Sequence, residues 1–222
     1  MTLPWLLVDL ENTQSSRSRL LHAAKLLFAR NGFEQTSTAA IAREAGTSES
    51  QLVRYFRGKA GLLEAIFDDG WAPLNGHIQQ AVGAAPSARE ALLGVLAIVS
   101  EAFASDHAMA FLFLFEGRRT RGDSHEVLLS KGFQNFSTLL QTLVRRGTLD
   151  GTFPSKLHPA SAAAALIGAV EGMIREMVIA ERSSKEKPFL DDQVRTIFTA
   201  IVDGLAQIPR TEPVNRRAGE GA

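Results

Sequence analysis

The 222-residue sequence contains no cysteine, which excludes a disulfide framework and any thiolate metal or redox site. Long apolar runs are also missing, because no stretch reaches the ~20 residues that a membrane-spanning helix needs. Residues 3–8 are apolar, but no basic segment precedes them and Asp9 and Glu11 follow, unlike the pattern of a signal sequence. We therefore expect a cytoplasmic protein.

Motifs of catalysis are missing as well. The sequence has no GxSxG segment, no phosphate-binding loop and no dinucleotide-binding glycine pattern. The five histidines show no metal-ligand spacing such as HxxxH and do not adjoin clustered acids. We therefore expect no enzyme activity, no metal site and no cofactor.

Charge is unevenly distributed, although the formal net charge is zero. Residues 17–60 hold eight basic side chains against three acidic ones, a net charge of +5. The rest of the chain holds 16 basic and 21 acidic residues, a net charge of −5. A basic segment on an acidic body favours binding to DNA phosphates, although many solvated surfaces show a similar bias.

The spacing of apolar residues predicts an all-α protein. No run of alternating β-branched residues lies between turn signals, so we expect no sheet. The pattern predicts helices at about residues 17–31, 38–45, 49–56, 59–77, 88–105, 124–146, 159–181 and 189–208. An aromatic segment covers residues 109–116, and a polar, turn-like segment covers residues 117–124.

Two short helices joined by a tight turn are predicted at residues 38–45 and 49–56. Such a pair forms the unit that places its second helix in a DNA major groove. Ala42 is small where the two helices cross, and Gly46 can supply the positive φ that the turn needs. Similar helix pairs also occur in proteins that never contact DNA.

The second helix of this pair has distinct inner and outer faces. Leu52 and Phe56, one turn apart, face the core. Ser48 is placed to cap the helix, and Gln51 three residues later completes a capping-box pattern. The outer face carries groups that can bond base edges and phosphates: Ser50, Gln51, Arg54 and Tyr55.

Residues 20–67 resemble the N-terminal domain of the TetR family of bacterial transcriptional regulators. They read LLHAAKLLFARNGFEQTSTAAIAREAGTSESQLVRYFRGKAGLLEAIF. The shared features are the AAxxLFxxxGF helix, the Thr-Ser pair opening the second helix, the IAxxAGxS turn and the L…YF…K…L sequence. The resemblance covers about 50 of 222 residues and implies a DNA-binding domain joined to a larger helical ligand-binding and dimerisation domain.

Position by position, the resemblance implies which residues contact DNA. It places phosphate contacts at the start of the second helix, on Thr36, Ser37 and Thr38. It makes residues 47–55, beginning with Thr47, the recognition helix, and it makes Lys59 a further phosphate contact. Among the outward residues of that helix, we expect Gln51, Arg54 and Tyr55 to read bases.

The sequence departs from the family pattern at three positions. Val53 stands where the family usually has tyrosine, so one phosphate contact is missing. Glu49 stands where lysine or proline is frequent; it either accepts a hydrogen bond from cytosine or offsets the dipole of the helix N-terminus. Ala39 stands where some members place a base-reading arginine.

The last two predicted helices carry faces suited to association. Residues 159–181 hold a stripe of small residues: Ser161, Ala165, Gly168 and Gly172. Residues 189–208 hold a wide apolar face that includes Ile197, Ile201 and Leu205. Packing within one chain explains the same pattern, but in the TetR family these helices pair with those of a second subunit. The resemblance thus implies a C2 homodimer that binds a palindromic operator.

The span between the two ends of the chain is rich in aromatic residues and methionine. These residues are Phe103, Met109, Phe111, Phe113, Phe115, Phe133, Phe136 and Met173. Most are expected to be plain core, and a minority to line an apolar cavity in which His107, His125 or Glu171 orients a ligand. We expect a small hydrophobic effector that binds one conformer and changes the spacing of the recognition helices.

The sequence therefore predicts a ligand-responsive transcriptional regulator, with double-stranded DNA, a hydrophobic effector and a second subunit as partners. We expect a repressor; activation is compatible with the same fold. A second hypothesis is a helical sensor or protein-interaction module with a degenerate helix-turn-helix, for which Val53 and Ala39 are the indications. The expected parts are a flexible arm (1–14), the helix-turn-helix domain (15–62), the ligand-binding and dimerisation domain (63–208) and a disordered tail (209–222).

Overall fold

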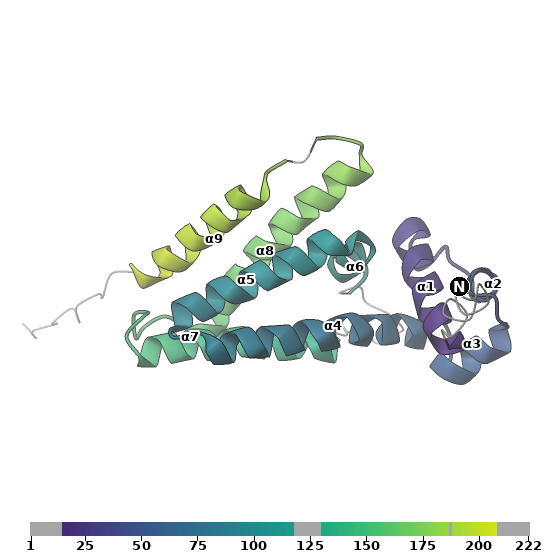
Figure 1. Cartoon of the computed structure of the whole chain (residues 1–222), viewed down its shortest axis with the longest axis horizontal. Coiled ribbons are helices and arrows are strands. Elements are labelled where there is room, and N and C mark those ends of the chain that lie inside the picture. The colour runs from purple at the N-terminus through teal and green to yellow at the C-terminus, as the bar shows by residue number, and fades with distance from the viewer. Residues whose placement is uncertain (1–14, 118–129, 187, 208–222) are drawn as a thin grey trace, which may run out of the picture.

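A computed structural model describes residues 15–117, 130–186 and 188–207, and the regular structure of these residues is entirely helical (Figure 1). The all-α prediction is confirmed. The elements are α1 (Ser16–Asn31), α2 (Thr38–Glu44), α3 (Glu49–Phe56), α4 (Lys59–Ala84), α5 (Ala88–Ser105), α6 (His107–Phe111), the π-helical turn η2 (Leu112–Glu116), α7 (Lys131–Leu149), α8 (Pro159–Arg182) and α9 (Asp191–Ala206). The expected arm and tail, and residues 118–129, lie outside the described residues.

α1, α2 and α3 form a small module at one end of the molecule (Figure 1). Leu20, Ile41 and Leu52, one from each helix, are fully buried and form its core. Gly46 has a φ of 58°, and the backbone N–H of Thr47 donates to the carbonyl of Ala42 at 2.9 Å. The turn between α2 and α3 is therefore the one that the sequence predicts.

α4 runs unbroken for 26 residues from the module into the body of the molecule (Figure 1). The expected domain boundary between residues 62 and 63 thus lies inside one helix. The prediction that this helix ends near residue 77 is wrong, because it continues to Ala84; Pro73 lies inside it, as predicted. Trp71, Leu74 and Ile78 are buried on both sides of the proline, and this burial outweighs the weak helix propensity of the segment.

The body is built from α4, α5, α7 and α8, which pack against one another. The aromatic segment predicted at residues 109–116 folds as α6 followed by η2. α7 begins at Lys131, where Ser130 accepts the hydrogen bond of the Phe133 N–H, and it ends three residues later than predicted. No single helix among the described residues is long and apolar enough to cross a membrane; the pair of α5 with α6–η2 meets that test by length and composition, but it is bent by 109°.

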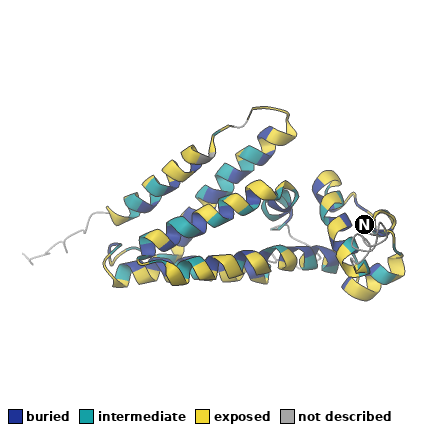
Figure 2. Ribbon diagram, viewed as in Figure 1, coloured by how far each residue is buried: buried dark blue, intermediate teal, exposed yellow. Residues whose placement is uncertain are grey.

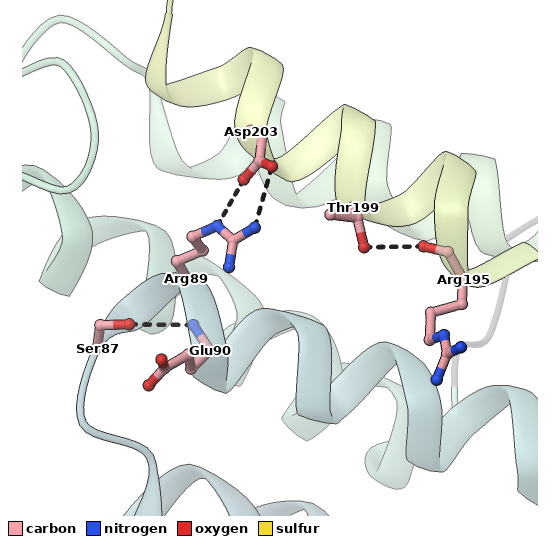
Figure 3. Close-up of polar contacts among 6 residues, drawn as sticks. All are labelled: Ser87, Arg89, Glu90, Arg195, Thr199 and Asp203. Atoms are coloured by element: carbon pink, nitrogen blue, oxygen red, sulfur yellow. Dashed lines mark hydrogen bonds and ion pairs between the residues drawn. The ribbon is translucent and has the colours of Figure 1, made fainter.

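α9 lies along α5 and is oriented by a bidentate ion pair (Figure 3). Arg89 Nε donates to Asp203 Oδ1 at 2.5 Å, and Nη2 donates to Oδ2 at 3.0 Å. The hydrogen bond from Arg89 lowers the pKa of the Asp203 carboxyl. Because both side chains are well exposed, the pair fixes the orientation of α9 more than it stabilises the fold. Val194, Phe198 and Val202 form the buried face of this helix.

Close packing at the start of α7 leads to a stability prediction. A Cβ added to Gly132 would lie 2.2 Å from the Trp71 Cβ, so Gly132→Ala should lower the free energy of unfolding by about 1–3 kcal/mol through overpacking. Gly76→Ala in α4 is the matched control, because outside the nearby backbone of α4 itself no described residue comes within 4 Å of its added Cβ. This substitution should raise stability by up to about 1 kcal/mol. Urea unfolding measures both, and equal stability of the two variants would contradict this packing.

Candidate nucleic-acid interface and internal cavity

The outer surface of the module is formed by the N-terminal turns of α2 and α3 and by the exposed face of α3 (Figure 2). Ser37 caps α2 by accepting a hydrogen bond from the Ala40 N–H at 3.1 Å. The Thr38 hydroxyl donates to Glu49 Oε2 at 2.6 Å, so the first turns of the two helices lie side by side. Glu49 therefore joins α2 to α3. This bond is compatible with either expected role, acceptance of a hydrogen bond from cytosine or offset of the helix dipole.

Arg54 and Tyr55 form a stacked pair on the exposed face of α3. The Arg54 guanidinium carbon lies 4.8 Å from the centroid of the Tyr55 ring, and Nη2 donates to the Tyr55 hydroxyl at 3.0 Å. The stack restricts both side chains, while the guanidinium fork keeps further N–H donors that match the edge of guanine. Val53 is 55% exposed beside them and offers no polar group.

Gln51 is held by its neighbour Thr47. The Thr47 hydroxyl donates to Gln51 Oε1 at 2.8 Å, which leaves the amide NH₂ as the donor that Gln51 can offer to a base. The predicted capping box is half confirmed, since Ser48 Oγ accepts from the Gln51 N–H at 3.3 Å but the Gln51 side chain bonds Thr47. Ser50 shares a 2.9 Å hydrogen bond with Ser48.

Thr36 requires a correction. Its side chain is 2% exposed, and its hydroxyl donates to the carbonyl of Gly32 at 2.7 Å and lies 3.3 Å from the carbonyl of Leu27. A buried hydroxyl that is bonded to the end of α1 cannot also bind a phosphate. The Thr-Ser pair is thus divided, with Thr36 in the core and Ser37 on the surface.

Lys59 also contributes to the fold of the module. Its ammonium donates to the carbonyls of Phe33 at 2.9 Å and Glu34 at 3.3 Å. It also lies 4.5 Å from the centroid of the Phe33 ring. The side chain ties the first turn of α4 to the loop between α1 and α2, so a phosphate at this position would have to share these bonds.

A cavity of about 40 Å³ lies where α4, α5, η2, α7 and α8 meet. Six aromatic rings form much of its wall: Phe67, Trp71, Phe103, Phe113, Phe133 and Phe136. Trp71 stacks on Phe113 with centroids 4.8 Å apart and an interplanar angle of 15°. Ile167 and Val170 of α8 complete an apolar lining.

The expected ligand residues divide into three groups. Phe103, Phe133, Phe136 and Glu171 line the cavity. Phe111, Phe115, Met173 and His107 do not, and His107 Nδ1 lies instead 2.7 Å from Glu181 Oε1 at the surface. His125 lies outside the described residues.

The sequence prediction missed two rings of the cavity wall, Phe67 and Trp71 of α4. They lie four residues apart and therefore on one face of the helix, which is the signal that could have identified them. Through them, the helix that carries the module also forms part of the cavity. In the described part of the chain, no three His, Cys, Asp or Glu side chains gather to hold a metal ion.

A salt bridge connects the module to the body. Lys25 Nζ of α1 lies 2.7 Å from Asp106 Oδ2, and Asp106 Oδ1 accepts the Met109 N–H at 3.0 Å, which caps α6. Burial acts to raise the pKa of Asp106, but the hydrogen bonds from Lys25 and the Met109 N–H, with the nearby charges, lower it. The Asp106 carboxyl is therefore ionised at neutral pH.

The residues expected at a dimer interface are all at least partly accessible. Ala165 and Gly168 are exposed on α8, and Gly172 is half-buried. Apart from the chain neighbours and nearby backbone of α8 itself, no atom of the described residues lies within 4 Å of a Cβ added to either glycine. On α9, Ile197 is 49% exposed, whereas Ile201 and Leu205 pack partly against the core. The stripe of small residues on α8 and Ile197 on α9 are thus the most accessible parts of the expected dimer interface.

Residues 20–66 match the model of a family described as bacterial regulatory proteins, tetR family. A fatty acid metabolism regulator protein of Bacillus subtilis is 23% identical over 165 residues, which cover 72% of this chain and 82% of the relative. The fold is also that of the fatty acid degradation regulator FadR from Bacillus halodurans, with a TM-score of 0.74, 21% identity and coverage of 84% and 98% of the two chains. FadR from Bacillus subtilis, solved with stearoyl-CoA, has a TM-score of 0.72 and 18% identity over 85% and 97%.

The corrected position of Thr36 gives a second prediction. Thr36→Val should lower the free energy of unfolding by about 1–2 kcal/mol, because the carbonyl of Gly32 loses its buried donor. It should leave the salt dependence of DNA binding unchanged, since no phosphate contact is removed. Thr138→Val on the exposed surface of α7 is the control and should change stability by less than about 0.5 kcal/mol. A smaller salt slope at wild-type stability would restore Thr36 as a phosphate contact.

Proposed function

We propose that the chain, whose residues 20–66 match the TetR family model, is a repressor whose homodimer binds a palindromic operator and releases it when a hydrophobic effector enters the cavity. The observation that carries the proposal is the exposed, polar face of α3 on a basic module. The module is connected through α4 to an aromatic cavity in the body.

Operator binding is assigned to the first turns of α2 and α3 and to the outer face of α3. Ser37 and Thr38 lie where phosphates would pass, and Thr47 and Ser50 flank the base-reading positions. Gln51 can donate through its amide, and the Arg54–Tyr55 stack can present a guanidinium fork to guanine. The basic charge of residues 17–60 supplies the attraction that does not depend on base sequence.

The base-reading role of Arg54 is open to a direct test. On an operator selected from random-sequence DNA, Arg54→Ala should cost about 1–3 kcal/mol of binding free energy, because a bidentate contact is lost. On scrambled DNA of the same length, the loss should be much smaller. Fluorescence anisotropy at several salt concentrations measures both, and Arg145→Ala on α7 controls for the lost charge. Equal weakening on the two DNAs would make Arg54 a phosphate contact.

A homodimer is proposed to form through α8 and α9. The exposed small residues of α8 permit close helix approach, and Ile197 adds an apolar contact on α9. A two-fold axis between these helices would present two copies of α3 to one face of DNA, about 34–36 Å apart or a small multiple of that. Such spacing requires a palindromic operator.

The dimer predicts a defined effect of charge at Ile197. Ile197→Glu should shift the protein from dimer to monomer in sedimentation at micromolar concentration, because the introduced carboxylate would be buried at the interface. Leu149→Glu is the control: Leu149 is 83% exposed on α7, and its replacement should leave the dimer intact. A wild-type protein that sediments as a monomer would refute the proposed dimer.

A long-chain acyl compound is the effector class that we propose. The aromatic and aliphatic lining suits an alkyl chain, and the similarity to a fatty acid metabolism regulator and to a FadR structure holding stearoyl-CoA supports the same class. An acyl thioester would bury its chain among the rings while its phosphates remain in water, because buried charge is costly.

In the conformer described, the cavity is too small for such a ligand. Its volume of about 40 Å³ is well below the ~150 Å³ of an engineered apolar cavity that accepts benzene. An effector must therefore displace rings of the wall, and it binds the displaced conformer more tightly than the closed one. This difference in affinity between conformers is what permits it to change operator binding.

A further inference from the structure

Arg182, the last residue of α8, joins the body to the DNA-binding module. Its guanidinium carbon lies 3.6 Å from the centroid of the Phe111 ring. The same guanidinium donates a hydrogen bond through Nη2 to the carbonyl of Ala29, near the end of α1. One side chain thus contacts both α1, which belongs to the module, and the segment that closes the cavity.

That segment, α6 followed by η2, separates the cavity from Arg182. Phe111 stacks on Phe115 with centroids 4.9 Å apart, and neither ring lines the cavity. Phe113 lies between them in sequence and lines it, stacked on Trp71. Residues two apart on a helix face nearly opposite sides, whereas residues four apart share one. Phe113 therefore faces the cavity, and Phe111 faces Arg182.

η2 is a single π-helical turn, in which the Gly117 N–H donates to the Leu112 carbonyl at 2.9 Å. A π-turn holds one residue more than an α-turn, so a change of register rotates the side chains that follow it. Displacement of Phe113 by an effector would rotate this turn. The rotation would move Phe115, which belongs to η2, and with it Phe111, which stacks on Phe115.

From this geometry we infer that η2 and Arg182 relay the occupancy of the cavity to the C-terminal end of α1. An effector that displaces Phe113 rotates η2, withdraws Phe111 from the guanidinium and loosens the bond from Arg182 to Ala29. This relay rests on the proposed function, because it specifies how the same cavity regulates the module.

Two further contacts make the relay one unit. His107 Nδ1 of α6 lies 2.7 Å from Glu181 Oε1, next to Arg182 in sequence. Asp106, which caps α6, lies 2.7 Å from Lys25 of α1. A movement of α6 and η2 therefore reaches α1 both through the end of α8 and directly.

Hydrogen exchange of the full chain tests the relay without DNA or effector. Arg182→Met should speed amide exchange in the second half of α1 by about 5-fold or more, a typical size for coupling between sites. Phe113→Leu should have the same effect, and the double variant should exceed neither single variant, because both interrupt one connection. Arg145→Met on α7 and Phe136→Leu in the cavity wall, which leave η2 intact, should not change α1.

Each outcome decides for or against the relay. Suppose that Arg182→Met speeds exchange in α1 and Phe113→Leu does not. Arg182 then stabilises α1 locally, independently of the cavity wall, and the relay is refuted. It is refuted equally if the two effects multiply in the double variant, or if Phe136→Leu acts like Phe113→Leu.

Operator binding with stearoyl-CoA as the probe separates the relay from the proposed function. In the wild type, stearoyl-CoA should raise the operator Kd, and in Arg182→Met the ratio of Kd with and without stearoyl-CoA should fall toward one. If the wild type ignores stearoyl-CoA while the exchange results hold, the proposed effector class fails and the relay stands. If Arg182→Met retains the full wild-type response to stearoyl-CoA, Arg182 does not carry the signal and the relay fails.

Discussion

The stacking of Trp71 on Phe113 holds the helix that carries the DNA-binding module against the segment that closes the cavity. Because α4 is continuous from Lys59 to Ala84, a movement of Trp71 is a movement of the same rigid element that packs on α1 and α3. Close packing leaves little room to absorb such a movement, because a Cβ on Gly132 would already collide with Trp71. The cavity wall and α3 are therefore connected through α4.

Local sequence signals predicted the module well, because its form depends on short-range physics. The small Ala42, the positive φ at Gly46 and the inward Leu52 follow from spacing within a few residues. Thr36 shows where this reasoning stops. A hydroxyl beside a helix start is a typical phosphate contact, and only the tertiary structure reveals that its partner is the carbonyl of Gly32 at the end of the preceding helix.

The sequence predicted that aromatic residues line the cavity, but it did not predict which ones. The aromatic span included Phe133 and Phe136, which line it, together with Phe111 and Phe115, which do not. The π-turn η2 determines which of these side chains face the cavity. The spacing of apolar residues in the sequence did not indicate that turn. Phe67 and Trp71 escaped prediction because the aromatic span expected to hold the cavity begins at Phe103, whereas α4 brings these two rings to the same wall.

The connection between cavity and operator is tested most directly by following both in one titration. In a Trp5→Phe variant, Trp71 is the sole tryptophan, so its fluorescence reports on the cavity wall while the anisotropy of labelled operator reports DNA binding. Addition of stearoyl-CoA should change both signals with one shared midpoint, because ring displacement and operator release are a single transition. A change in Trp71 fluorescence that leaves the operator bound would contradict that connection.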